Sequence, residues 1–209
     1  MSHCTKFEFN YTSEEAIVKA FSKLGLKSFT GVVAKYNSDF SKKVLSQLGY
    51  AGTQQYRSIC ANQDKYNVFL CKIAENHYEL LVECGVKTAE DNFKMKQIAE
   101  SFQRSYVEVA VDDSLSRITD LGVPARRKDK VDGYEIEFGP NYEYTIFVTI
   151  DGNQVTEEVS GVIGDVCTKL TEELESILAS PTAELTTTWK NEYSMILDDQ
   201  TLQILSINL

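Results

Sequence analysis

Cys167 is the residue of this sequence whose surroundings most suggest chemistry. It ends the pattern Gly161-x-x-Gly164-x-x-Cys167, in which the glycines mark a turn before a predicted helix. Exposed backbone N–H groups at the start of a helix attract anions and lower the pKa of a thiol, so one interpretation is a thiol-dependent enzyme that uses Cys167. The thiol also shares a helical face with Leu170 and Leu174, which favours core packing. The sequence leaves thiol chemistry as an alternative to that packing.

Other residue types with catalytic or metal-binding potential do not converge along the sequence. The acidic pairs Glu157-Glu158 and Glu172-Glu173 are adjacent, and side chains one position apart do not face each other on a strand or a helix. The two histidines, His3 and His77, lie far apart, and the five cysteines include no CxxC pair, so we expect no zinc site. The motifs of nucleotide-binding loops, zinc proteases and serine hydrolases are absent from the sequence. We therefore expect no catalytic residue, no cofactor and no metal.

Acidic residues are concentrated in the last third of the chain. The 209 residues contain 21 Lys+Arg and 31 Asp+Glu, a net charge of −10. Residues 1–140 contain 19 of each sign, whereas residues 141–209 contain 2 basic and 12 acidic residues. This asymmetry predicts two units, 1–140 and 141–209. An acidic surface repels nucleic-acid phosphates and favours a basic protein partner, unless the charge only keeps the protein in solution.

The main cluster of positive charge is Arg126-Arg127-Lys128-Asp129-Lys130. The cluster is short and interrupted by an acid, which is typical of a solvated loop. A weak nucleic-acid site formed by residues 126–130 is the second alternative function.

The sequence gives a simple expectation for the location of the protein. No apolar run approaches the length of a membrane-spanning helix, and the N-terminus lacks the apolar region of a secretory signal. An odd number of unpaired cysteines is typical of reduced thiols. We therefore expect a cytoplasmic protein with no membrane partner, and the sequence leaves its oligomeric state open.

Hydrophobic periodicity and turn residues predict the elements. Helices are predicted over 13–24, 90–121 and 165–179, hairpins over 66–84 and 144–159, and further strands over 3–9 and 29–36. Residues 37–65 are the least regular part, with a short helix expected near Val44 to Leu48. These elements do not alternate in parallel units, so we expect an α+β fold in which helices cover antiparallel sheets. For the first unit we expect a ferredoxin-like arrangement, and for the second a β-hairpin followed by a helix.

Several local features sharpen this prediction. Thr12 and Glu15 fit a capping box at a helix start, and Gly25 is a natural helix stop. In the first hairpin, strict alternation places Glu79 and Glu83 on the face opposite the apolar residues. The phase of the apolar stripe changes near Asp112-Asp113, which suggests that a second helix begins there. That stripe indicates a core face and comprises Met95, Ile98, Phe102, Tyr106 and Val109.

Two segments of the chain resemble known families. Residues 1–138 are similar to the plastid and cyanobacterial hypothetical-reading-frame proteins collected as domain of unknown function 1257. That similarity lies in Met1-Ser2-His3-x-Thr5, Ala20…Leu24-Gly25, Tyr66-Asn67-Val68…Glu75-Asn76-x-Tyr78-Glu79-Leu80 and Gln103-Arg104-Ser105-Tyr106, and the segment 37–65 departs from that family. Residues 143–180 resemble domain of unknown function 2997. That likeness lies in Ile146-x-Val148-x-Ile150-Asp151-Gly152…Val159-x-Gly161-x-x-Gly164-x-x-Cys167-x-x-Leu170-Thr171-x-x-Leu174-Glu175.

The resemblance implies a partner. Members of both families tend to be encoded beside an AAA-type ATPase, and neither family has established catalytic residues to carry over. We therefore expect a non-catalytic adaptor or accessory subunit that works with an AAA-type ATPase. The candidate partner-binding residues are aromatic side chains of the tail and acidic side chains of the last third, namely Trp189, Tyr193, Glu157, Glu158, Asp198 and Asp199.

Overall fold

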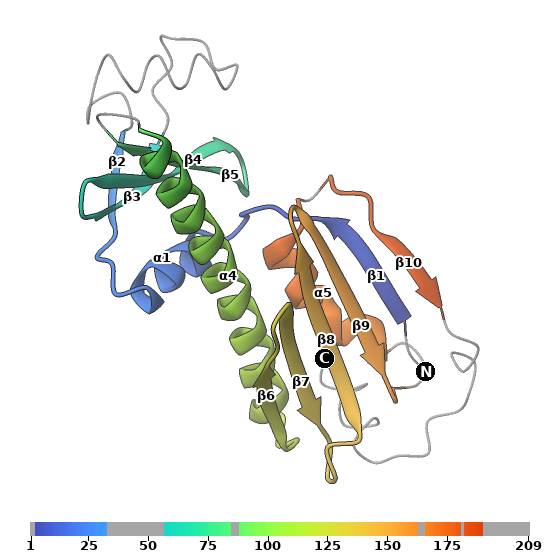
Figure 1. The fold of residues 1–209 in the computed structure, drawn as a ribbon. Helices are drawn as coiled ribbons and strands as arrows, with labels where there is room; N and C mark the ends of the chain where they lie inside the picture. Colours follow the sequence, from blue (N-terminus) through green and yellow to red (C-terminus); the bar gives the residue numbers. More distant parts are fainter. Residues whose placement is uncertain (1–2, 33–56, 85–87, 163–165, 181, 190–209) are drawn as a thin grey trace. The chain divides into compact units, whose positions relative to one another are not determined.

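The computed structural model describes residues 3–32, 57–84, 88–162, 166–180 and 182–189 (Figure 1). These residues form two sheets and three helices, and every pair of neighbouring strands is antiparallel. The expected α+β class is therefore confirmed. None of the described helices combines the length and the apolar character that a membrane crossing needs.

The chain folds as two compact units. One comprises residues 1–10 and 108–209 and the other residues 11–107; we call them the six-stranded unit and the four-stranded unit after their sheets. The expected boundary at 140/141 differs from this division because it falls between β7 and β8, where Ile136 and Ile146 are cross-strand partners in one sheet. The N-terminal strand β1 also belongs to this sheet, although its partners come from the C-terminal half.

The six-stranded sheet has the order β10-β1-β9-β8-β7-β6. Its strands are β1 (His3–Glu8), β6 (Ala125–Asp129), β7 (Gly133–Phe138), β8 (Tyr144–Asp151), β9 (Gln154–Ser160) and β10 (Thr186–Trp189). Helix α5 (Val166–Leu178) lies against one face of this sheet (Figure 1) and buries Leu170, Leu174 and Leu178. The predicted hairpin and following helix of the last third are thus confirmed, with Gly152 at φ 59° in the tight turn between β8 and β9.

The four-stranded sheet has the order β2-β3-β4-β5. Its strands are β2 (Phe29–Val32), β3 (Arg57–Gln63), β4 (Tyr66–Ala74) and β5 (His77–Cys84). Two helices supply the rest of this unit's core: α1 (Glu14–Lys23) and the first part of α4 (Ala89–Asp120). The rings of Phe21 and Phe102 lie 4.6 Å apart and both are fully buried. Of the predicted stripe, Ile98, Phe102, Tyr106 and Val109 are buried and Met95 is partly exposed.

The sheet orders differ from the expected ferredoxin-like arrangement. A ferredoxin-like unit is a split βαβ fold, in which crossover connections place strands that are not consecutive side by side. The strands β2 to β5 instead follow one another in chain order, and so do β6 to β9. Short hairpins such as β4–β5, with Asn76 at φ 51° in its turn, join consecutive strands directly and so favour a meander.

Local differences have physical causes. Ser13 rather than Thr12 caps α1: its hydroxyl accepts a hydrogen bond from Ala16 N at 3.2 Å, while the Thr12 N–H donates to Tyr106 Oη. Gly25 follows the helix at φ 71°, as expected. Helix α4 continues through Asp112-Asp113 as one helix. In the turn before these residues, apolar side chains are buried on several sides of the helix, so the apolar stripe can change phase there without the helix ending.

Two further expectations are corrected and others lie outside the described residues. Glu83 is buried at 2% exposure, where an exposed face was expected, and it accepts a hydrogen bond from Asn67. Residues 126–129 form strand β6 rather than a loop. The short helix near Val44 to Leu48 and the second half of the 29–36 strand fall outside the part of the chain that the structure describes.

Candidate functional site

Glu157, a predicted partner-binding residue, lies inside the six-stranded unit. Its exposed fraction is 0%, so the expectation that it meets a partner is wrong. The cause is the alternation of β9, which places Glu157 on the same buried face as Val155 and Val159. Its neighbour Glu158 points to the other face, opposite Cys4 and Phe147, and is partly exposed.

Glu157 belongs to a group of polar residues between β1, β9 and α5, which we call the buried polar cluster. The cluster comprises His3, Thr5, Glu157, Thr171 and Glu175; the first four are at most 1% exposed and Glu175 is half-buried. Thr5 is the cross-strand partner of Glu157. The Thr171 hydroxyl lies 3.4 Å from His3 Nε2 and 3.4 Å from Glu175 Oε1, and it also reaches the Thr168 carbonyl at 3.1 Å.

The electrostatics of this cluster favour neutral groups. Burial raises the pKa of Glu157 well above its ordinary value, and the nearby Glu175 carboxylate adds to the effect. Burial likewise raises the pKa of Glu175, against the hydrogen bond from Thr171. Burial lowers the pKa of His3. The structure therefore favours a carboxylic acid at Glu157 and an uncharged imidazole at His3.

Sequence reasoning missed His3, Thr171 and Glu175. The signal for His3 was present, because His3 alternates with Thr5 and Phe7 on the buried side of β1. Thr171 and Glu175 are four residues apart on α5 and so share a helical face. The described residues contain no group of three or more His, Cys, Asp or Glu side chains placed to hold a metal ion.

Besides the partly exposed Glu158, Trp189 is a predicted partner-binding residue that the structure leaves exposed. It ends β10, is 44% exposed, and its ring lies 5.3 Å from the ring of His3, its cross-strand partner. Leu185, just before β10, is 46% exposed. We call Leu185 and Trp189 the β10 patch. The other tail residues of the prediction, Tyr193, Asp198 and Asp199, lie outside the described residues.

The structure describes the surroundings of several cysteines but not those of Cys167, the candidate of the thiol alternative. Cys167 is the second residue of α5, and its side chain is outside the described part of the structure. Cys60, Cys71 and Cys84 are buried. Burial raises the pKa of Cys60 to about 12 and that of Cys71 to about 11. Thiols with such pKa values are protonated near neutral pH and therefore poor nucleophiles.

The basic cluster of residues 126–130 is matched by carboxylates. Arg126 Nε lies 2.6 Å from Glu137, Lys128 also pairs with Glu137, and Lys130 Nζ lies 2.9 Å from Glu135. Arg127 contacts three further carboxylates, those of Glu108, Asp112 and Asp129. The hydrogen bonds from Lys128 first, and then from Arg126, lower the pKa of Glu137 to about 2. Cations already opposed by carboxylates have less to gain from phosphate groups, which does not favour the nucleic-acid alternative.

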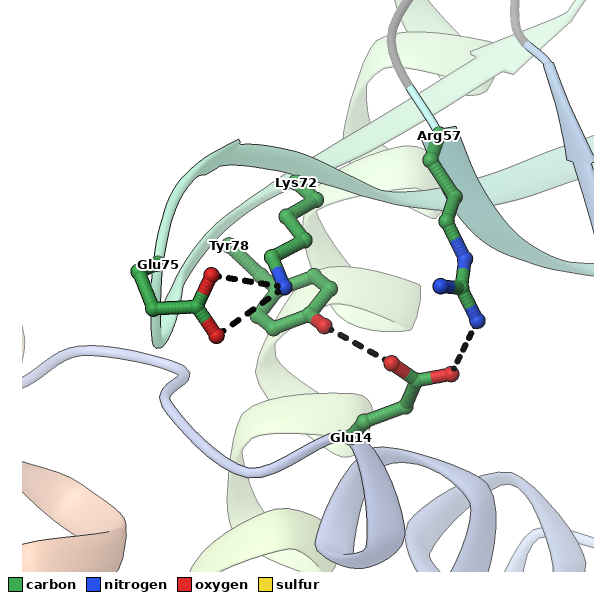
Figure 2. Close-up of polar contacts among 5 residues, drawn as sticks. All are labelled: Glu14, Arg57, Lys72, Glu75 and Tyr78. Atoms are coloured by element: carbon green, nitrogen blue, oxygen red, sulfur yellow. Dashed lines mark hydrogen bonds and ion pairs between the residues drawn. The ribbon is translucent and has the colours of Figure 1, made fainter.

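A polar network in the four-stranded unit fastens the start of α1 to the sheet. Figure 2 shows the Glu14 carboxylate between two donors: Tyr78 Oη at 3.0 Å and Arg57 Nη2 at 2.9 Å. On the same hairpin, Lys72 Nζ pairs with Glu75 and lies 5.9 Å from the centre of the Tyr78 ring. Burial and the hydrogen bond to Glu14 raise the pKa of Tyr78 to about 12. Each group here has a partner, which fits a structural role.

The four-stranded unit also carries an open groove of about 550 Å³. Its walls come from the end of α1, the end of β3 and one face of α4, and include Leu24, Gln63 and Gln97. The charged residues at the groove, Lys94, Glu100 and Arg104, have both signs and are exposed. This mixture defines no particular ligand chemistry.

Comparisons with protein-family models, with curated proteins and with solved structures find no match to this chain. The resemblances described for residues 1–138 and 143–180 therefore remain predictions, as does the ATPase partner that they imply.

Proposed function

We propose that this protein is a non-catalytic adaptor that works with an AAA-type ATPase and binds it through the β10 patch. The observation that carries the proposal is Trp189, a large aromatic side chain that remains 44% exposed at the end of a sheet strand. Tryptophan is enriched among the few interface residues that supply most of the binding energy. Leu185 adds a second exposed apolar side chain immediately before the same strand.

The contact with His3 supports an anchoring role for Trp189. Its ring lies 5.3 Å from the buried His3 ring, and β10 pairs with β1 through four cross-strand positions. A side chain held by a sheet loses less conformational freedom on binding than one in a loop, and this preorganisation raises affinity.

Charge supports a basic docking surface on the partner. Residues 141–209 contain 12 acidic and 2 basic residues, and complementary charge raises the rate and selectivity of encounter. The identity of the partner as an AAA-type ATPase rests on the family resemblance, and the β10 patch supplies the surface.

The test is direct binding of the purified protein, at low and high salt, to an AAA-type ATPase of the kind encoded beside members of the resembled families. We expect association that weakens at high salt and falls about 30-fold on Trp189→Ala, since a hot-spot aromatic contributes about 2 kcal/mol. The matched control is Phe93→Ala, which removes an aromatic side chain with 64% exposure from the four-stranded unit and should bind like the parent. No association at either salt, or equal losses for both variants, would refute the proposal.

A further inference from the structure

Glu157 differs from Glu175, the other acid of the buried polar cluster, because its carboxyl group accepts no hydrogen bond from the described residues. Its side chain is fully buried, and neither carboxyl oxygen finds a hydrogen-bond partner among the described residues. A buried carboxylate without hydrogen bonds or a counter-charge is costly, whereas the protonated acid is far less so. Packing around Glu157 and retention of its proton are therefore linked.

The groups that face Glu157 do not relieve this cost. From β1 come Thr5, directly opposite, and His3, on the same face two residues away. From α5 comes the Glu175 carboxyl group, whose ionisation is disfavoured by the nearby negative charge of Glu172. From β8 comes the apolar cross-strand partner Val148. The nearest titratable groups are thus a second acid and a histidine whose Nδ1 also has no hydrogen-bond partner within the described part of the chain.

β1, which contributes His3 and Thr5 to the cluster, pairs with β10, the strand that ends at Trp189 of the β10 patch. β1 is bonded to β9 on one side and to β10 on the other, and Thr5 contacts Thr187 through their hydroxyl groups at 3.1 Å. His3, within the cluster, contacts Trp189. The pairing of β1 beside Glu157 is therefore linked to Trp189 through His3 and the β1–β10 pairing.

We propose that Glu157 is a proton-operated latch: with its proton in place β1 stays paired beside it and α5 packs over it, and loss of the proton to water loosens β1 and with it the β10 patch. The role of that patch in docking rests on the proposed function; the latch itself does not. The direction follows from linkage. A carboxyl that holds its proton more tightly in the folded state stabilises the fold below its ordinary pKa of 4.5, and this stabilisation is lost as pH rises toward the raised pKa. His3 acts in the opposite sense, because its lowered pKa removes stability below 6.5.

Fluorescence tests the latch without any partner, since Trp189 is the chain's single tryptophan. Urea unfolding of the six-stranded unit is followed at Trp189 between pH 5 and 9 for the parent, Glu157→Gln and Glu158→Gln. We expect the unfolding equilibrium constant of the parent to rise with pH, by up to tenfold per unit for one proton. That rise should be reduced in Glu157→Gln to the part that Glu175, whose pKa is also raised, contributes, and it should be kept in Glu158→Gln, the control on the opposite face. Glu157→Leu serves as a second uncharged variant if Glu157→Gln does not fold.

The outcomes separate the latch from titration of His3. Identical pH profiles for the parent and the two Glu157 variants would overturn the latch. So would a transition that survives in Glu157→Gln and disappears in His3→Asn, which would assign the effect to His3. Binding to the ATPase is measured separately. A pH transition lost in Glu157→Gln together with binding that ignores Trp189→Ala would support the latch and refute the proposed function.

Discussion

Asp91 of the four-stranded unit and Glu157 of the six-stranded unit are both buried carboxyl groups, and their surroundings are opposite. The Asp91 side chain pairs with Lys65 and accepts hydrogen bonds from the Thr88 hydroxyl, the Thr88 backbone N–H and Tyr66 Oη, at 2.8, 3.0 and 2.9 Å. Lys65 first, and then Thr88, lower the pKa of Asp91 below its ordinary range. Glu157 has neither a cation nor a donor among the described residues, and its pKa is raised.

The comparison shows two ways in which a fold accommodates a buried acid. Near Asp91 the chain supplies enough donors to keep the charge, and the acid then caps helix α4 together with Thr88. On the face of β9 that carries Glu157, Val155 and Val159 are also buried and the described residues offer the carboxyl group no hydrogen-bond donor, so the acid keeps its proton instead. The first arrangement fixes a local structure at neutral pH, whereas the second makes the stability of the fold depend on pH.

The largest expected effect comes from removing the apolar packing that holds the Glu157 region together. Leu174 is fully buried on α5, and Leu174→Ala should lower the free energy of unfolding by about 3 kcal/mol, because a cavity replaces the side chain. Urea unfolding followed at Trp189 measures this, with the exposed Ser176→Ala on the same helix as the control. A loss below about 1 kcal/mol, the range of ordinary substitutions, would show that the packing of Leu174 does not stabilise the region of the buried polar cluster.

The next effect is a gain in stability. Glu157→Leu replaces a buried carboxyl without hydrogen bonds by an apolar side chain, so we expect the protein to become more stable by about 2 kcal/mol at pH 7. The same unfolding measurement tests it, with Glu158→Leu, at the partly exposed neighbour, as the control that should show no such gain. A less stable Glu157→Leu protein would mean that Glu157 has a favourable partner, which would break the contrast with Asp91.

A smaller effect is expected at the cap of α4. The Thr88 hydroxyl accepts from the Asp91 N–H at 3.1 Å and donates to the Asp91 carboxylate, so Thr88→Ala should destabilise the four-stranded unit by about 1 kcal/mol. Urea unfolding followed by far-ultraviolet circular dichroism measures the loss. Thr88→Ser keeps the hydroxyl and should recover most of it; failure to recover would assign the effect to the lost methyl group.

The smallest effect is expected for Lys65→Met, because the Lys65 side chain is 64% exposed and solvent screens its charge. The small loss should be present at pH 7 and still at pH 3, since the lowered pKa keeps Asp91 ionised in the folded protein at both pH values, and it should disappear only as pH falls through that lowered pKa. Unfolding at pH 7 and pH 3, each at low and high salt, tests this. A loss that high salt leaves unchanged at both pH values would come from packing rather than from charge.

Much of the local structure could be predicted because it depends on the spacing of apolar and turn residues over short stretches of sequence. The hairpins at 66–84 and 144–159 and the three described helices follow from alternation, apolar stripes and turn glycines such as Gly25 and Gly152. The division into units could not be predicted, since net charge carries no information about which strands pair. Thr5 is opposite Glu157 and Thr187 in the sheet, and nothing near Thr5 in the sequence specifies partners so far along the chain.

The site was harder to predict than the fold for the same reason. Glu157 stands beside Glu158 in an acid-rich segment, so composition suggested a surface, although its spacing from Val155 and Val159 indicated the core face. Residues 126–130 suggested a loop because charges cluster there. Their role became clear only with the register of β6 and β7, which sets Arg126 opposite Glu137.

The position of β1 in its sheet has a consequence for synthesis of the protein. β1 (His3–Glu8) is synthesised long before its neighbours in the sheet, because β9 and β10 begin at Gln154 and Thr186. At ordinary elongation rates, β1 therefore waits roughly 10–30 s for its partners, while every strand of the four-stranded unit has already emerged. During that interval β1 has neither of its sheet partners, and its backbone N–H and C=O groups remain open to pairing with other chains.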